Sequence, residues 1–150
     1  MKQVIKLMLF VVVVLALITG CKKAKTSPQF SAGTGSYVFN GTSVNTKDTL
    51  APDPFSGGKD VTMWPATGGK DLVFVYNMPA QGSGTFPLTD GTSQSSVYIL
   101  GHNGQINFSS TGAPSDILTK TGTNTFTFSC TVADDSNPGN TYTLTGSGSY

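Results

Sequence analysis

The chain has 150 residues with nine Lys, eight Asp, no Arg and no Glu, which gives a formal net charge of +1. That balance offers no electrostatic reason to expect nucleic acid as a partner. The lack of Arg also removes the side chain best suited to clamping phosphate or carboxylate through two parallel hydrogen bonds. The length suits one domain of ordinary size once an N-terminal leader is set aside.

The first 20 residues have the features of a secretory signal peptide. Lys2 and Lys6 make the N-terminus basic, and an unbroken apolar run follows from Leu7 to Ile18. A membrane-spanning helix needs about 20 apolar residues, so this run is too short to cross a bilayer. A basic start, a short apolar run and small residues at its end instead predict a cleaved signal over residues 1–20.

The end of this leader, Ile18-Thr19-Gly20-Cys21, resembles the lipobox of bacterial lipoproteins. In that family the cysteine thiol receives diacylglycerol, the chain is cut before the cysteine, and the new amine is usually acylated. The resemblance implies that Cys21 is the lipidated first residue of the mature chain, anchored by acyl chains such as palmitate. Because one acyl chain binds membranes only marginally, two or three are needed for stable anchoring. The alternative is an ordinary signal peptide cut nearby, with Cys21 incidental.

Residues 21–35 are predicted to be a lipidated, flexible tether. The run from Lys22 to Lys25 lacks the acidic residues that resemble surface-export signals in Bacteroidota lipoproteins. We therefore expect a lipid-anchored protein of the outer membrane that faces the periplasm. Cys130 is the only other cysteine, so lipidation of Cys21 leaves no partner for an intrachain disulfide.

Residues 36–150 have the pattern of a β domain, in which short strand signals alternate with clusters of Gly, Pro, Asn and Asp. Thr beside branched and aromatic residues is typical of half-buried strands. Asn40-Gly41 between two short runs predicts a hairpin with a type I′ turn. The expected strand segments are 36–44 with that turn, 60–64, 71–77, 84–88, 96–100, 105–109, 124–132 and 140–146.

The last two segments carry the clearest pattern. Phe126, Phe128, Cys130 and Val132 alternate with Thr and Ser, which predicts one buried face and one wet face. Residues 133–139 have turn chemistry, so the two segments should pair as an antiparallel hairpin. Cys130 is then a small buried residue rather than a reactive thiol. About eight short strands predict an all-β fold, and an antiparallel β-sandwich is preferred to a barrel because the strands are short and turn-rich.

Several features of residues 36–150 resemble a group of uncharacterised Bacteroidota lipoproteins that is known only as a domain of unknown function. The matching steps are "FNGTSV" at 39–44, "GTFPL" at 84–88, "TFTF" at 125–128 and "GSY" at 148–150. Asn124 stands where that group has glycine before the third step. The resemblance implies a β-rich fold and gives no catalytic residues to carry over.

Candidate metal and catalytic residues are sparse. His102 is the only histidine, and without Glu only scattered aspartates could join it, so a turn residue is preferred to a metal ligand. Asp134 and Asp135 could offer oxygen ligands to Ca²⁺, but their spacing does not fit an EF-hand loop. We therefore expect no metal, no cofactor and no catalytic residue, and Ca²⁺ at the turn of Asp134-Asp135-Ser136-Asn137 stays open as an alternative.

One short pattern occurs twice, as "SGGKD" at 56–60 and "TGGKD" at 67–71. Neither copy has the Ser or Thr that must follow Lys in a phosphate-binding loop. Ser56 and Lys59 match the spacing of a Ser-x-x-Lys nucleophile, but two glycines disfavour the helix which that chemistry needs. Both copies are predicted to be hairpin turns that lead into strands.

Three further hypotheses concern carbohydrate. The paired carboxylates of a glycoside hydrolase could come from among Asp48, Asp53, Asp60, Asp71 and Asp90. Trp64 with Phe55, Tyr76 and Tyr98 could stack on sugars, but we expect Trp64 in the core, with Pro65 marking the end of its strand. Asp48-Thr49-Leu50 resembles the O-glycosylation motif of Bacteroidota envelope proteins, so Thr49 is a candidate modification site.

These observations favour a non-enzymatic envelope lipoprotein that binds a protein or a glycan or has a structural role. Its expected partners are the membrane, through the anchor, and one such ligand. Two alternatives stay open: a polysaccharide hydrolase that acts through two aspartates, and an accessory subunit of an envelope complex.

Overall fold

The computed structural model describes residues 31–53, 56–68, 71–80, 82–90, 94–101 and 105–150, and these form strands and no helix. The strands are β1 (Ser31–Phe39), β2 (Thr42–Pro52), β3 (Lys59–Pro65), β4 (Leu72–Met78), β5 (Gly84–Pro87), β6 (Ser96–Leu100), β7 (Ile106–Ser110), β8 (Ile117–Lys120), β9 (Thr125–Asp134) and β10 (Asn137–Ser149). Every pairing between them is antiparallel. The prediction of an all-β, antiparallel fold is therefore confirmed, and each expected segment overlaps a strand.

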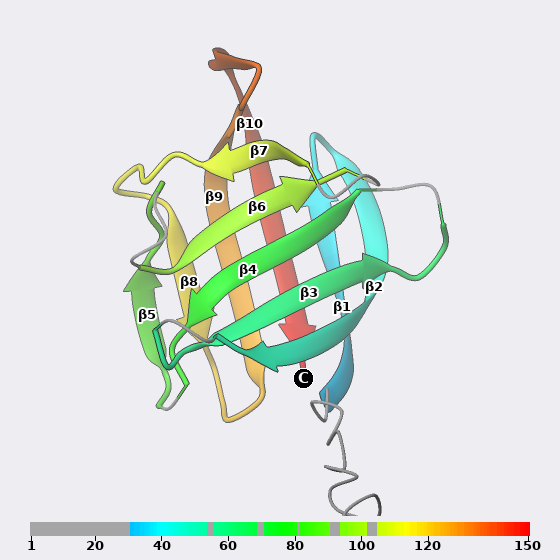
Figure 1. Ribbon diagram of the computed structural model, residues 1–150, viewed down its shortest axis with the longest axis vertical. Helices are drawn as coiled ribbons and strands as arrows, with labels where there is room; N and C mark the ends of the chain where they lie inside the picture. Colours follow the sequence, from blue (N-terminus) through cyan, green and yellow to red (C-terminus); the bar gives the residue numbers. More distant parts are fainter. Residues whose placement is uncertain (1–30, 54–55, 69–70, 81, 91–93, 102–104) are drawn as a thin grey trace, which may run out of the picture.

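Eight of these strands close into a barrel. They follow the order β10-β1-β2-β3-β4-β6-β7-β9, and β9 also pairs with β10, which completes the ring (Figure 1). The prediction of a sandwich is wrong, because one sheet curls until its two ends pair and no second sheet faces it. β10 has 13 residues and pairs with β1 along one edge and with β9 along the other.

Glycine lets β10 lie close to the interior of the barrel. A Cβ atom at Gly146 would meet the ring of Phe128, and one at Gly148 would meet the ring of Phe126. A side chain at either position would therefore push a phenyl ring out of place.

The barrel begins earlier than the sequence suggests. β1 starts at Ser31, so residues 31–35 belong to a strand and the predicted end of the tether at residue 35 is wrong. These residues pair with β2, and Gly35 also pairs with Gly148 of β10. A glycine-rich composition suggests flexibility, but here it allows close approach, because a Cβ atom at Gly33 or Gly35 would collide with the backbone of β10.

The turn between β1 and β2 is confirmed as predicted. Asn40 and Gly41 have φ angles of 47° and 77°, and two positive φ angles are what a type I′ turn requires. The hairpin of β9 and β10 is also confirmed, although its strands run to Asp134 and Asn137, with a bulge between Asn137 and Thr141. That turn is therefore shorter than the predicted 133–139.

One edge of β9 is shared by two partners. Residues 132–134 pair with β7 inside the ring, whereas residues 126–129 pair with β8, which pairs in turn with β5. β8 and β5 therefore extend the sheet beyond the ring, at the left of Figure 1. The sequence does not predict β8, because a strand of four residues is too short to show a period.

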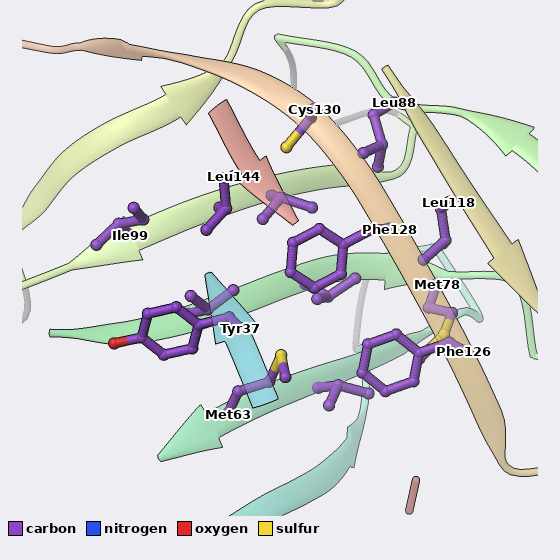
Figure 2. Packing of buried hydrophobic residues seen from close by; sticks show 14 of the residues in the cluster. Tyr37, Met63, Met78, Leu88, Ile99, Leu118, Phe126, Phe128, Cys130 and Leu144 are labelled. Carbon is purple, nitrogen blue, oxygen red and sulfur yellow. The ribbon is translucent and has the colours of Figure 1, made fainter. Parts of the chain in front are cut away.

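Side chains fill the interior of the barrel (Figure 2). Phe126, Phe128, Cys130 and Val132 are buried, as the alternation predicts. The rest of the core is Tyr37, Val44, Val61, Met63, Val73, Val75, Met78, Leu88, Val97, Ile99, Leu118, Leu144 and Tyr150. Burial of one large apolar side chain contributes about 1.5–3 kcal/mol, so this cluster is the main source of stability.

Cys130 lies among these core side chains. Burial, with a smaller contribution from the charge of Asp116, raises the pKa of its thiol to about 12. The thiol therefore stays protonated at neutral pH and is shielded from reagents, as expected of a structural cysteine.

The described residues include no helix with the length and hydrophobicity that a membrane crossing needs.

Candidate functional site

One end of the barrel opens into a pocket that we call the mouth. Its volume is about 230 Å³. Its lining residues come from the β1–β2 hairpin, from the residue before β4 and from β6, and they are Tyr37, Phe39, Asn40, Thr42, Val44, Asp71 and Ile99. The mouths of β-barrels are among the preferred places for small-molecule sites, because the rigid wall holds side chains around a concave opening.

Tyr37 forms the floor of the mouth. Its ring is buried at the edge of the core, and Figure 2 shows its hydroxyl pointing away from the other labelled side chains. The hydroxyl donates a hydrogen bond of 2.5 Å to the backbone carbonyl of Asp71. Burial, and then the charge of Asp71, raise the pKa of Tyr37 to about 12. Tyr37 therefore stays a neutral hydrogen-bond donor at any physiological pH.

Asp71 lies beside Tyr37 at the start of β4. The side-chain amide of Asn107 in β7 donates to Asp71 Oδ2 at 3.4 Å. The Tyr37 bond holds the backbone of Asp71 and the Asn107 bond orients its carboxylate, so a carboxylate lies at the rim of the pocket. A carboxylate in that position can accept hydrogen bonds from a ligand.

Three aromatic rings pack together beside the mouth. Phe39 lies with its ring centroid 4.9 Å from that of Phe108 and 5.6 Å from that of Tyr142, and the centroids of Phe108 and Tyr142 are 5.5 Å apart. All three are half-buried and pack against the core. Phe39 also lines the pocket, whereas Asn40 and Thr42 beside it are exposed. The mouth thus combines an aromatic wall with amide, hydroxyl and carboxylate groups.

The aspartates proposed for hydrolysis are distributed over separate regions. Asp53 and Asp60 are near enough for the charge of Asp53 to contribute to the raised pKa of Asp60, for which burial is the larger cause. Asp71 lies at the mouth, and Asp90 lies in the connection after β5. Asp48 is buried in β2. Asp53 and Asp60 are thus the pair that remains for a two-carboxylate mechanism.

Asp53 accepts a hydrogen bond within the β2–β3 connection, and Asp60 accepts one that joins β3 to β4. The hydroxyl of Ser56 donates to Asp53 and also lies 2.5 Å from Asn77 Oδ1. The backbone N–H of Asn77 donates to Asp60 at 3.0 Å. Such bonds are typical of side chains that fix a turn. Ser56 and Asn77 also line a pocket of about 330 Å³.

Ser56 and Lys59 do not form a nucleophile pair. The Lys59 ammonium lies 5.5 Å from the centroid of the Tyr150 ring, whereas the partners of the Ser56 hydroxyl are Asp53, Asn77 and the backbone N–H of Gly58. As predicted, the first copy of the repeated pattern starts in the connection before β3 and enters that strand at Lys59. The described residues of the second copy lie in the connection before β4, and residues 69–70 are outside the described part.

The prediction that Trp64 belongs to the core is wrong. Its side chain is 49% exposed on the outer face of β3, and its indole Nε1 donates to Thr49 Oγ1 at 3.1 Å. Val61 and Met63 point inward from the same strand, so the alternation itself places Trp64 outside. β3 ends at Pro65, as predicted.

The remaining predicted site residues fall into two groups. Cys21, Phe55 and His102 lie outside the described residues. Thr49 is half-buried on β2 and accepts the Trp64 bond, so its glycosylation stays a prediction.

The Asp134-Asp135 turn has the bonds of an ordinary turn. Asp134 Oδ1 accepts the backbone N–H of Ser136 at 2.8 Å, and Asp135 Oδ1 accepts the hydroxyl of Ser109 at 2.8 Å. Within the described ranges, no three His, Cys, Asp or Glu side chains are grouped so that they could hold a metal ion.

The chain matches no family model, no curated protein and no solved structure. The resemblances to the lipobox and to the Bacteroidota lipoprotein group therefore stay predictions, and the functional argument depends on the residues of the barrel.

Proposed function

We propose that this chain is a lipid-anchored, non-enzymatic protein of the bacterial envelope whose mouth binds the end of a glycan. The observation that carries the proposal is the mouth itself, where the half-buried ring of Phe39 adjoins exposed Asn40 and Thr42 and the carboxylate of Asp71. Sugar rings combine apolar C–H faces with a rim of hydroxyls. A site of aromatic, amide and carboxylate groups complements both features.

The volume of the mouth limits the ligand. About 230 Å³ lies below the range of roughly 300–1,000 Å³ that is usual for small-molecule sites. Such a pocket holds one sugar ring and not an oligosaccharide. We therefore expect recognition of a terminal monosaccharide unit, with the rest of the glycan in solvent.

The proposed anchor is consistent with this use of the mouth. β1 runs from Ser31, which follows the tether, to Phe39, which lines the mouth, so the mouth is at the far end of the barrel from the tether. A chain held at Cys21 in the outer membrane would present its mouth away from the bilayer, toward the periplasm. Mass spectrometry of the native protein should find diacylglycerol on Cys21, and an unmodified thiol there would refute the anchor.

Glycan binding can be tested with the full mature protein in detergent micelles on an array of bacterial envelope glycans. Any glycan that binds is then titrated by calorimetry against Phe39→Ala and Asp71→Asn. Each variant is expected to weaken binding about tenfold or more, because it removes the aromatic wall or the charged acceptor. Trp64→Ala, which changes an exposed aromatic on the outer face, is the matched control.

The control also shows on which part of the protein the glycan binds. If binding is lost in Trp64→Ala and kept in Phe39→Ala, the sugar site is on the outer face and the mouth proposal is wrong. Absence of binding to every glycan on the array would count against the function itself.

A second candidate, hydrolysis of a glycosidic bond, is favoured by the proximity of Asp53 and Asp60 and by the raised pKa of Asp60. The test is release of reducing sugar by the wild type, Asp53→Asn and Asp60→Asn, with Asp90→Asn as a control. Turnover that either of the first two variants abolishes would establish an enzyme and displace the non-enzymatic proposal.

A further inference from the structure

The opposite end of the barrel contains a second pocket, which we call the lysine pocket. It has a volume of about 430 Å³ and lies between the connection from β4 to β5 and the connection from β8 to β9. Its lining residues are Ala80, Gly82, Ser83, Lys120, Thr121, Gly122 and Thr123. No motif in the sequence points to it, because these residues come from two separate parts of the chain, the connection after β4 and the end of β8 with the turn that follows it.

Lys120 is the unusual member of this pocket. It ends β8, two residues after the core residue Leu118, so it shares the inward face of that strand. Its side chain is only 2% exposed, although Lys is almost never fully buried unless it is paired. A lysine that lines a pocket from inside the fold therefore requires an explanation.

The described residues give this ammonium one acceptor. Lys120 Nζ donates to the backbone carbonyl of Pro79 at 2.6 Å, and an ammonium has three hydrogens to donate. Within the described ranges no carboxylate forms an ion pair with it, and the charged group that acts on it is another cation, Lys59. Burial, and then the charge of Lys59, lower the pKa of Lys120. A buried cation without a counter-charge is costly, so an anion in the pocket would relieve that cost.

The rest of the pocket offers neutral donors. Ser83 and Thr123 are exposed, and both residues line the same pocket as the lysine. The hydroxyl of Thr121 lies 2.9 Å from that of Thr125, so it has a partner in the protein. Gly82 and Gly122 add no side chain, which leaves room for a ligand. Lys binds phosphate as a point charge, without the paired geometry of Arg.

We propose that the lysine pocket binds a phosphate group, with Lys120 supplying the counter-charge and the hydroxyls of Ser83 and Thr123 supplying further hydrogen bonds. The phosphate could be a free ion or part of a lipid headgroup. The second source depends on the proposed anchor, because the pocket and Ser31 are at the same end of the barrel and an anchored chain would turn this end toward the bilayer. The first source is independent of the anchor and of the glycan proposal.

Inorganic phosphate is the first probe, with the full mature protein in an uncharged detergent. Thermal unfolding is compared in phosphate and in chloride at the same ionic strength and pH. At a phosphate concentration of ten times Kd, the midpoint should rise by about 3–5 °C. Equal midpoints in the two salts at every concentration would overturn the proposal.

Lys120→Met is the central variant, because Met keeps the length of the side chain and removes its charge. The phosphate-dependent rise should disappear in Lys120→Met and persist in Lys47→Met, where an exposed lysine of β2 is changed instead. Ser83→Ala with Thr123→Val provides a second test if Lys120→Met does not fold. This double variant keeps Lys120, and it should unfold like the wild type in chloride while needing at least several times more phosphate for the same rise. An unchanged phosphate response in either variant contradicts the assignment.

Vesicles distinguish the two sources of phosphate. The protein without its acyl chains, produced with Cys21→Ser and without the signal peptide, is mixed with vesicles of phosphatidylglycerol or of phosphatidylcholine. Binding to phosphatidylglycerol that inorganic phosphate displaces and that Lys120→Met abolishes indicates a lipid headgroup. Phosphate stabilisation without vesicle binding indicates a free phosphate. Because neither result involves the mouth, failure here leaves the glycan test unaffected.

Discussion

At the mouth, the buried hydroxyl of Tyr37 and the carboxylate of Asp71 have hydrogen-bond partners in the protein, whereas at the lysine pocket a buried charge has, among the described residues, a single neutral partner. Tyr37 and Asn107 both donate to Asp71, and the ring that bears the Tyr37 hydroxyl belongs to the core. Lys120 is also buried, yet within the described ranges its partner is one backbone carbonyl. The two sites therefore differ in how far protein groups satisfy their buried hydrogen-bonding atoms. The buried hydroxyl of Tyr37 is satisfied without a ligand, whereas among the described residues the ammonium of Lys120 has one acceptor for its three hydrogens.

The strand pairing explains part of this difference. Near the mouth, hydrogen-bonded strands follow one another without interruption through β1, β2, β3, β4 and β6. Near the lysine pocket, β9 pairs with β8 outside the ring, and the bond from Lys120 to Pro79 joins β8 to the residue that follows β4. At the lysine pocket, the side chain of Lys120 therefore links two segments, whereas near the mouth neighbouring strands are linked by backbone pairing.

The largest expected contrast concerns packing. Phe126, at the lysine end, is 1% exposed, whereas Phe39 at the mouth is half-buried. Phe126→Ala should lower the free energy of unfolding by about 3–5 kcal/mol through lost burial and a cavity. Phe39→Ala should cost less than half of that. Urea unfolding followed by circular dichroism measures both, and equal losses would contradict the expectation that Phe126 contributes more burial than Phe39.

A smaller contrast is expected between two glycines. In Gly148→Ala the new methyl group would meet Asp48 and the ring of Phe126, which should cost up to about 3 kcal/mol. In Gly41→Ala, at the turn beside the mouth, the methyl group meets open space and only the positive φ angle is unfavourable, at about 1 kcal/mol. Thermal unfolding of both variants gives the comparison, and a larger loss in Gly41→Ala would reverse it.

The third prediction concerns pH and the charge of Lys120. Because its pKa is lowered in the folded state from an ordinary value of 10.5, the unfolded chain binds this proton more readily. The free energy of unfolding of the wild type, relative to that of Lys120→Met, should therefore rise with pH through the window that ends near 10.5. Urea titrations in chloride buffers from pH 7 to pH 10 measure this difference. A difference that stays constant would mean that the fold does not disfavour the charged form.

The smallest effect is expected at the rim of the mouth. Asn107 is half-buried, and its bond to Asp71 is long at 3.4 Å. Asn107→Ala should lower the free energy of unfolding by less than about 1 kcal/mol, because water can replace the lost donor. Ser110→Ala is a useful comparison, since that buried hydroxyl donates to the carbonyl of Thr89 and accepts the N–H of Val97. It should cost more, and a greater cost for Asn107→Ala would show that the rim is structural.

The local features of this fold can be predicted from the sequence. The Asn40-Gly41 turn depends on two residues that tolerate positive φ angles, and the inward face of β9 depends on a period of two over eight residues. Closure of the ring cannot be predicted from the sequence, because it requires residues 35–39 to pair with residues 144–148, more than 100 positions away. An alternating pattern shows which face is buried, but a sandwich and a barrel bury their strands in the same way.

The candidate sites show the same limit. Trp64 could have been placed outside, since Val61 and Met63 occupy the inward positions of its strand. Lys120 follows Leu118 at the same spacing, but the usual exposure of Lys argues against an inward position. The mouth could not be predicted at all, because its residues come from 37 to 99 in the chain and meet only when the ring closes.

The arrangement of β5 has a consequence for behaviour at high concentration. Closure of the ring leaves none of its eight strands with a fully unpaired side, so among the described strands β5 ends the sheet. β5 has only four residues, and Pro87 at its end has no N–H to offer a neighbouring chain. Each copy of the protein therefore offers little unpaired strand edge to which the sheet of another copy could bond. We expect the domain to resist aggregation at high concentration.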